Sequence, residues 1–105
     1  MIISDHISYK EATQSDTAIR MGINNKPDSD VLTAMEAVAK YCFEPLREWY
    51  GKPIRINSFY RSPELNKAVK GSKTSQHVLG EAIDIDAGSK EENEKLFNLA
   101  MANLV

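Results

Sequence analysis

The chain carries the segment Ser75-Gln76-His77-Val78-Leu79-Gly80-Glu81-Ala82-Ile83-Asp84-Ile85-Asp86, in which an imidazole and a carboxylate stand seven positions apart across a glycine. Ligands of one tetrahedral zinc ion lie about 2.0–2.2 Å from the metal, whereas seven extended residues span roughly 23 Å. His77 and Asp84 can therefore share an ion only if the chain folds back between them. Gly80, which has no Cβ, can adopt the backbone angles of such a turn. The segment is typical of half a metal site.

The residues after this turn alternate in hydrophobicity, which is typical of a strand with one buried face. Ile83 and Ile85 fall on one face, and Ala82, Asp84 and Asp86 fall on the other. If the isoleucines pack in the core, Asp84 is held on the opposite face beside a small residue, where an ion has room. We interpret Asp86 as a strand-end or turn residue in preference to an alternative ligand.

Five of these residues follow the spacing Ser-x-His-x-x-Gly-x-Ala-x-Asp, namely Ser75, His77, Gly80, Ala82 and Asp84. This spacing resembles the first zinc-binding motif of the zinc D-alanyl-D-alanine carboxypeptidases, which share a fold with the hedgehog signalling domain. The family resemblance also includes the upstream segment Ser58-Phe59-Tyr60-Arg61-Ser62-Pro63-Glu64-Leu65-Asn66, which is similar to the compact cell-wall peptidases of phages and bacteria. It extends loosely from about residue 7 to the C-terminus.

The resemblance implies that His77 and Asp84 are zinc ligands. It implies that Arg61 binds the substrate and the transition state through a carboxylate or carbonyl oxygen, and that Ser75 contacts the substrate peptide. A guanidinium suits this role because it binds a carboxylate through two parallel hydrogen bonds. The alternative for Arg61 is a surface ion pair with Glu64, and the neighbouring motif favours the substrate role.

The sequence departs from the family where the third ligand is expected. That ligand is a histidine in a later Trp-His segment, closely preceded by a Glu or Asp general base, and the chain has no such segment. We expect His6, the other histidine, to be solvent-exposed near the terminus, with a substitute third ligand as the minor alternative. Glu81 is a formal candidate for the base, but strand alternation turns it away from Asp84. The general base is thus absent, and we expect weak zinc affinity and little or no peptidase activity from this chain alone.

The predicted fold class is α+β, with N-terminal helices packed on a small antiparallel sheet as in the hedgehog/DD-peptidase fold. Only two clear strands are predicted, and a lone pair of strands is marginal. The last helix also reaches Val105 without a residue that would stop it. We therefore expect residues 1–105 to be a single, incomplete DD-peptidase-like domain, either the N-terminal part of a longer peptidase or a natural short form.

Local patterns predict the helices. Ser8 and Ser15 have the spacing of N-caps, and Gly22 is a plausible terminator of the second helix. Apolar residues then recur at helical spacing from about residue 29 to residue 50, with Cys42 and Trp49 on the apolar stripe and therefore expected to be buried. Pro45 predicts a kink or break near residues 41–43.

The second half of the chain begins with a predicted strand at residues 54–59. Ser62 followed by Pro63 predicts a helix that runs to residue 69. Ser89 has capping-box spacing and predicts a last helix. Its expected apolar stripe comprises Leu96, Phe97, Ala100, Met101 and Leu104.

Composition restricts the partners. The chain has 13 basic and 15 acidic residues in 105 and no basic run, so we expect neither a nucleic-acid nor a membrane partner. The single Cys42 excludes an internal disulfide. Without a secretion signal or an apolar span, we expect cytoplasmic synthesis, with phage lysis as a route of release to peptidoglycan. The oligomeric state is not determined by these features.

Two functions remain open. The first is a zinc metallopeptidase that cleaves D-amino-acid-containing peptides of bacterial peptidoglycan, with the stem peptide as its partner, as a carboxypeptidase or an endopeptidase. The second is a non-catalytic module with a degenerate peptidase fold that binds cell-wall peptide or a protein. The agreement of Ser75, Gly80, Ala82 and the Arg61 segment with the family pattern favours the first.

Overall fold

The structure, a computed structural model, describes residues 2–103. Its elements in chain order are β1 (Ile2–Ser4), β2 (Ile7–Ser8), α1 (Tyr9–Thr13), α2 (Asp16–Met21), α3 (Ser29–Val38), the π-helical segment η1 (Ala39–Phe43), α4 (Glu44–Tyr50), β3 (Arg55–Ser58), α5 (Pro63–Ala68), β4 (Asp84–Asp86) and α6 (Lys90–Asn103). The strands form two antiparallel pairs, β1 with β2 and β3 with β4. The predicted combination of helices with a small antiparallel sheet is confirmed, and the β1–β2 hairpin is an addition to it.

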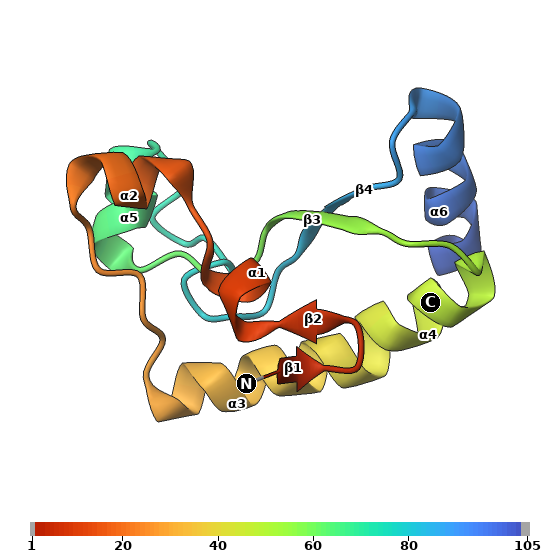
Figure 1. Ribbon diagram of the computed structural model, residues 1–105, viewed down its shortest axis with the longest axis horizontal. Helices are drawn as coiled ribbons and strands as arrows, with labels where there is room; N and C mark the ends of the chain where they lie inside the picture. The colour runs from red at the N-terminus through yellow and green to blue at the C-terminus, as the bar shows by residue number, and fades with distance from the viewer. Residues whose placement is uncertain (1, 104–105) are drawn as a thin grey trace.

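The elements are arranged around one long helical rod, which is formed by α3, η1 and α4 (Figure 1). The β1–β2 hairpin lies against this rod, and α1 contacts both the hairpin and β3. At one end of the molecule α2 contacts α5, and at the other end α6 packs on α4. The β3–β4 pair therefore runs between two groups of helices.

The helix caps confirm the local predictions. Ser8 and Glu11 form a complete capping box at the start of α1, and the hydroxyl of Ser15 accepts from the third amide of α2. Gly22 ends α2 in the left-handed region with φ of 67°. Ser62 caps α5, with proline in the first turn as predicted.

The long helix is interrupted where proline was expected to disturb it. Pro45 has no N–H to donate to the preceding turn, and it lies in the first turn of α4, directly after the π-helical segment. The wider π turn rotates the following residues, so the buried face passes through Ala39 and Phe43. Cys42 is consequently exposed and Trp49 is 42% exposed, and the prediction that both are buried is wrong.

The core lies between the long rod, the hairpin and β3. Its buried members are Ile3, Ile7, Ala12, Met35, Ala39, Phe43, Leu46, Ile54, Phe59, Tyr60 and Leu96. Within the described part of the chain, no helix combines the length and the apolar character needed to cross a membrane.

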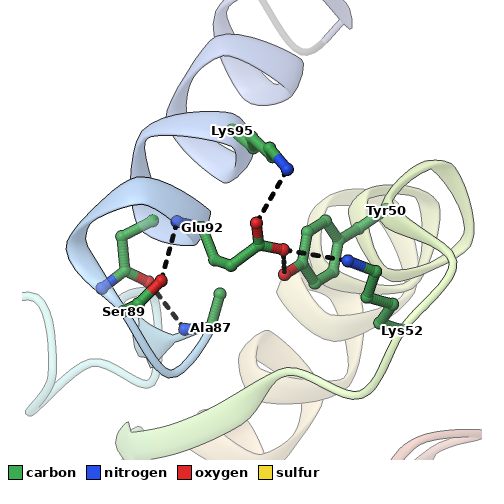
Figure 2. Close-up of polar contacts among 7 residues, drawn as sticks. Tyr50, Lys52, Ala87, Ser89, Glu92 and Lys95 are labelled. Carbon is green, nitrogen blue, oxygen red and sulfur yellow. Dashed lines mark hydrogen bonds and ion pairs between the residues drawn. The ribbon is translucent and has the colours of Figure 1, made fainter.

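The helix α6 is anchored by Glu92 (Figure 2). One carboxylate oxygen accepts from the hydroxyl of Tyr50 at 2.5 Å and from Lys52 at 3.0 Å, and the other accepts from Lys95 at 2.8 Å. Half of the predicted capping box is present, because the hydroxyl of Ser89 accepts from the backbone amide of Glu92. The carboxylate itself turns to the end of α4, which ties the two helices together.

The predicted apolar stripe of α6 is partly wrong. Leu96 is buried and Ala100 packs against the core, but Phe97 is 65% exposed and Met101 is also exposed. The helix rests on α4 along one side, so Phe97 and Met101 have no cover within residues 2–103. Leu104 lies outside the described residues.

Candidate metal centre

Asp84 is the first residue of β4 and pairs across the sheet with Ser58, the last residue of β3. The register continues with Ile56 opposite Ile85, and an irregularity falls between residues 56 and 58. Ile83 and Ile85 pack against the core, whereas the side chain of Asp84 is 61% exposed. The alternation read from the sequence therefore describes the two faces correctly.

The chain folds back between His77 and Asp84 through a tight turn at Gly80. The amide of Gly80 donates to the carbonyl of His77 at 3.2 Å, and φ of Gly80 is 73°. A Cβ at this position would lie 2.6 Å from Cγ of Met35 and 2.9 Å from the carbonyl oxygen of Val31. Glycine is thus required both by the backbone conformation and by the close approach to α3.

The imidazole of His77 is oriented by the backbone of Phe59. His77 is 7% exposed, and its Nδ1 lies 2.7 Å from the carbonyl oxygen of Phe59. Since a carbonyl can only accept, Nδ1 carries a hydrogen and donates it. In the neutral ring Nε2 then presents a lone pair, as in metal-binding histidines whose other nitrogen donates to a carbonyl.

The nitrogen that is left free faces Asp84. Nε2 of His77 lies 3.2 Å from Oδ2 of Asp84. Two acceptors at this distance repel each other unless a proton or a cation lies between them. Two ligands of one tetrahedral zinc ion stand about 3.3–3.6 Å apart, so the pair fits the first two ligand positions with little movement.

The residues present fit two of the ligand positions of a zinc ion. Among residues 2–103, no group of three or more His, Cys, Asp or Glu side chains is arranged to hold a metal ion. The roles of His77 and Asp84 as ligands stay predictions.

Arg61 follows β3 and is coupled to the same turn. Its backbone amide donates to the carbonyl of His77 at 3.2 Å, and its Nη2 donates to the hydroxyl of Ser75 at 3.4 Å. That hydroxyl also accepts from the amide of His77 at 3.2 Å. Nε of Arg61 is buried and has no hydrogen-bond partner among residues 2–103. No ion pair with Glu64 is found in the described part of the chain, so the surface-pair alternative is not realised.

Arg61 lines an open cleft of about 270 Å³. Its lining is mostly polar and includes Gln14, Ser15, Asn57 and Ser58 beside Arg61. His77 and Asp84 are not among its lining residues. Ser75 is hydrogen-bonded both to Arg61, which lines this cleft, and to the backbone amide of His77.

His6 lies elsewhere. It follows β1, and its Nδ1 is 2.5 Å from Oε1 of Glu44. The other oxygen of Glu44 accepts from the hydroxyl of Ser4 and from the amide of His6. Burial alone would raise the pKa of Glu44, but the hydrogen bonds from Ser4 and His6 outweigh it and lower the pKa. His6 fastens the hairpin to the long rod and does not complete the metal pair.

These features define a candidate metallohydrolase, in which a histidine and an aspartate lie 3.2 Å apart and an arginine is hydrogen-bonded to the loop that carries the histidine. The family model described as Peptidase M15 matches residues 5–103, and the chain belongs to this family. The predicted family is thereby confirmed, and with it a relationship to peptidases. Neither the comparison with curated proteins nor that with solved structures gives a match.

Proposed function

We propose that the protein is a zinc metallopeptidase that cleaves D-amino-acid-containing peptides of bacterial peptidoglycan, as a carboxypeptidase or an endopeptidase. The observation that carries the proposal is the 3.2 Å separation of Nε2 of His77 and Oδ2 of Asp84, with Nδ1 of the same ring committed to Phe59. Membership of the Peptidase M15 family supports hydrolysis of a peptide bond. The zinc ion, the cell-wall stem peptide and release from the cytoplasm in a phage or prophage setting belong to the proposal.

Each residue has a distinct task in this proposal. His77 and Asp84 hold zinc, which when bound acts as a Lewis acid that polarises the scissile carbonyl and acidifies water. The carbonyl of Phe59 fixes the tautomer of His77. Arg61 binds a carboxylate or carbonyl oxygen of the substrate through its guanidinium. Ser75 holds the guanidinium and orients the substrate peptide.

The proposal is tested by titrating a D-Ala-D-Ala peptide into the protein by calorimetry, with and without zinc. We expect zinc to raise the peptide affinity, and H77A and D84N to remove this increase. R61A should weaken peptide binding in both conditions, because the guanidinium contacts the substrate directly. H6A is the matched control, because the imidazole of His6 contacts Glu44 and not the His77–Asp84 pair. This variant should behave like the parent.

Turnover is expected to be slight, because only two ligands are present among the described residues. Peptide binding that ignores zinc, or zinc dependence that survives H77A, would contradict the proposal.

A non-catalytic module that binds cell-wall peptide or a protein partner is the second candidate. The observation that favours it is that no third ligand joins His77 and Asp84 within residues 2–103. In that case a protonated imidazole and the aspartate form a purely structural ion pair. Peptide affinity of equal strength with zinc and with a chelator identifies this candidate.

A further inference from the structure

The backbone around Arg61 is held from several directions. The amide of Tyr60 donates to the carbonyl of Ala12 at 3.0 Å, and the amide of Arg61 donates to the carbonyl of His77. The carbonyl of Phe59 accepts from the ring of His77. Arg61 and His77 thus position each other, and any group that fixes residues 59–62 also acts on the candidate metal pair.

The side chain of Asn25 is hydrogen-bonded to the backbone on both sides of Arg61. Nδ2 of Asn25 donates to the carbonyl of Tyr60 at 3.1 Å and to that of Thr13 at 2.9 Å. Oδ1 of Asn25 accepts from the amide of Ser62 at 2.7 Å. The two peptide groups that flank Arg61 are therefore both bonded to a single amide, which also ties them to the end of α1.

The chemistry of this contact is specific for an amide. It requires two donors toward carbonyl oxygens and one acceptor toward an N–H, all on one short side chain. A carboxylate cannot donate, and a hydroxyl has a single hydrogen. Asn25 lies outside the two motifs that resemble the family, in the connection between α2 and α3.

We infer that Asn25 is a positioning residue for Arg61 and, through the bond from Arg61 to His77, for the candidate metal pair. The importance of Arg61 and His77 rests on the proposed function, but the positioning itself is a property of the fold. Asn25 acts on the site because it is hydrogen-bonded to the carbonyl of Tyr60 and the amide of Ser62. These bonds fix the backbone of Arg61 and so the direction in which its side chain extends.

The test compares N25A and N25D with N24A by nuclear magnetic resonance of ¹⁵N-labelled protein. Asn24 is the matched control, because its side chain only accepts from the nearby amide of Lys26. In N25A we expect shifts of the amide signals of Arg61 and Ser62 and of the ring nitrogens of His77. The dissociation constant for zinc should also rise, because Asn25 holds the backbone that is hydrogen-bonded to His77. N24A should leave all of these unchanged.

N25D separates the loss of specific hydrogen bonds from a general loss of stability. Only the first predicts that the amide signals recover at low pH. Its carboxylate faces two carbonyl oxygens, but the protonated acid can donate one hydrogen bond. The amide signals of Arg61 and Ser62 in N25D should therefore return toward the parent positions on acidification, starting above the ordinary aspartate pKa of about 4, because the two carbonyl oxygens favour the protonated acid. N25A should show no such return.

The inference is overturned if N25A shifts only residues 22–28, or if N25D does not return on acidification. Should N25A not fold, hydrogen exchange in the parent protein decides. We expect the amide of Ser62 and the Nδ2 protons of Asn25 to exchange more slowly than the amide of Lys26, and equal rates would overturn the inference. The spectra need no metal, so a parent protein that binds no zinc counts against the proposed function alone.

Discussion

At the scale of single residues, the candidate site depends on how little freedom His77 has. Its ring is buried, and its Nδ1 donates a hydrogen bond to the backbone carbonyl of Phe59. Its own carbonyl accepts hydrogen bonds from the amides of Arg61 and Gly80. The imidazole is therefore presented to Asp84 by the fold, with one nitrogen left for a proton or a cation. This preorganisation reduces the conformational cost of binding an ion.

Gly80 allows the most direct test of this local geometry. In G80A the backbone would hold a left-handed conformation and the new Cβ would collide with Met35 and Val31. We expect a loss of about 2–5 kcal/mol in the free energy of unfolding, measured by urea denaturation. G51A is the matched control, because Gly51 has φ of 75° and nothing within 4 Å of a Cβ. It should lose only about 1–2 kcal/mol. Equal losses would refute the close approach to α3.

The residue scale also shows what the sequence could predict. The turn at Gly80 and the outward direction of Asp84 follow from spacing and alternation, which are local properties. Asn25 was beyond such reasoning, because its partners at residues 13, 60 and 62 are distant in sequence and are backbone atoms. The role of Phe59 in orienting His77 is carried by its carbonyl, which leaves no signal in side-chain type.

At the scale of elements, two carboxylates join parts of the chain that are about 40 residues apart in sequence. Glu44 holds the β1–β2 hairpin on the long rod, and Glu92 holds α6 on α4 (Figure 2). The helices were predictable because each capping side chain lies within four residues of the backbone amide that it accepts from. The exposure of Trp49 was not, because it depends on a π turn that shifts the buried face.

The contact at Glu92 should give stability a defined pH dependence. Hydrogen bonds from Lys95, Tyr50 and Lys52 lower the pKa of Glu92 from 4.5 to about 2, and its side chain is 22% exposed. A depressed pKa in the folded state stabilises the protein above the unfolded value, and this stabilisation is lost as the pH falls from about 4.5 to about 2.

We expect E92Q to be less stable than the parent at pH 7, with a difference that shrinks as the pH approaches 2. Urea denaturation at several pH values measures it. E94Q, on the exposed side of the same helix, should match the parent throughout. A constant difference between E92Q and the parent across this range would show that the charge of Glu92 is not responsible.

At the scale of the whole molecule, two groups of helices are linked by a two-stranded sheet, and the candidate site lies where that sheet meets the loop before β4 (Figure 1). The family match over residues 5–103 confirms the resemblance that two short motifs indicated. The expectation that residues 1–105 form one incomplete DD-peptidase-like domain stays a prediction. The hairpin could not be predicted, because its strands are three and two residues long and carry little alternation.

The central claim is that Nε2 of His77 and the carboxylate of Asp84 bind one cation. The measurement that tests it most directly is a zinc titration followed by the ring nitrogen signals of both histidines and the side-chain carboxyl signal of Asp84. We expect Nε2 of His77 and the carboxyl of Asp84 to shift together along one saturation curve, with Nδ1 still hydrogen-bonded and His6 unchanged. Zinc that shifts His6 first, or that leaves His77 and Asp84 in place, would contradict the account.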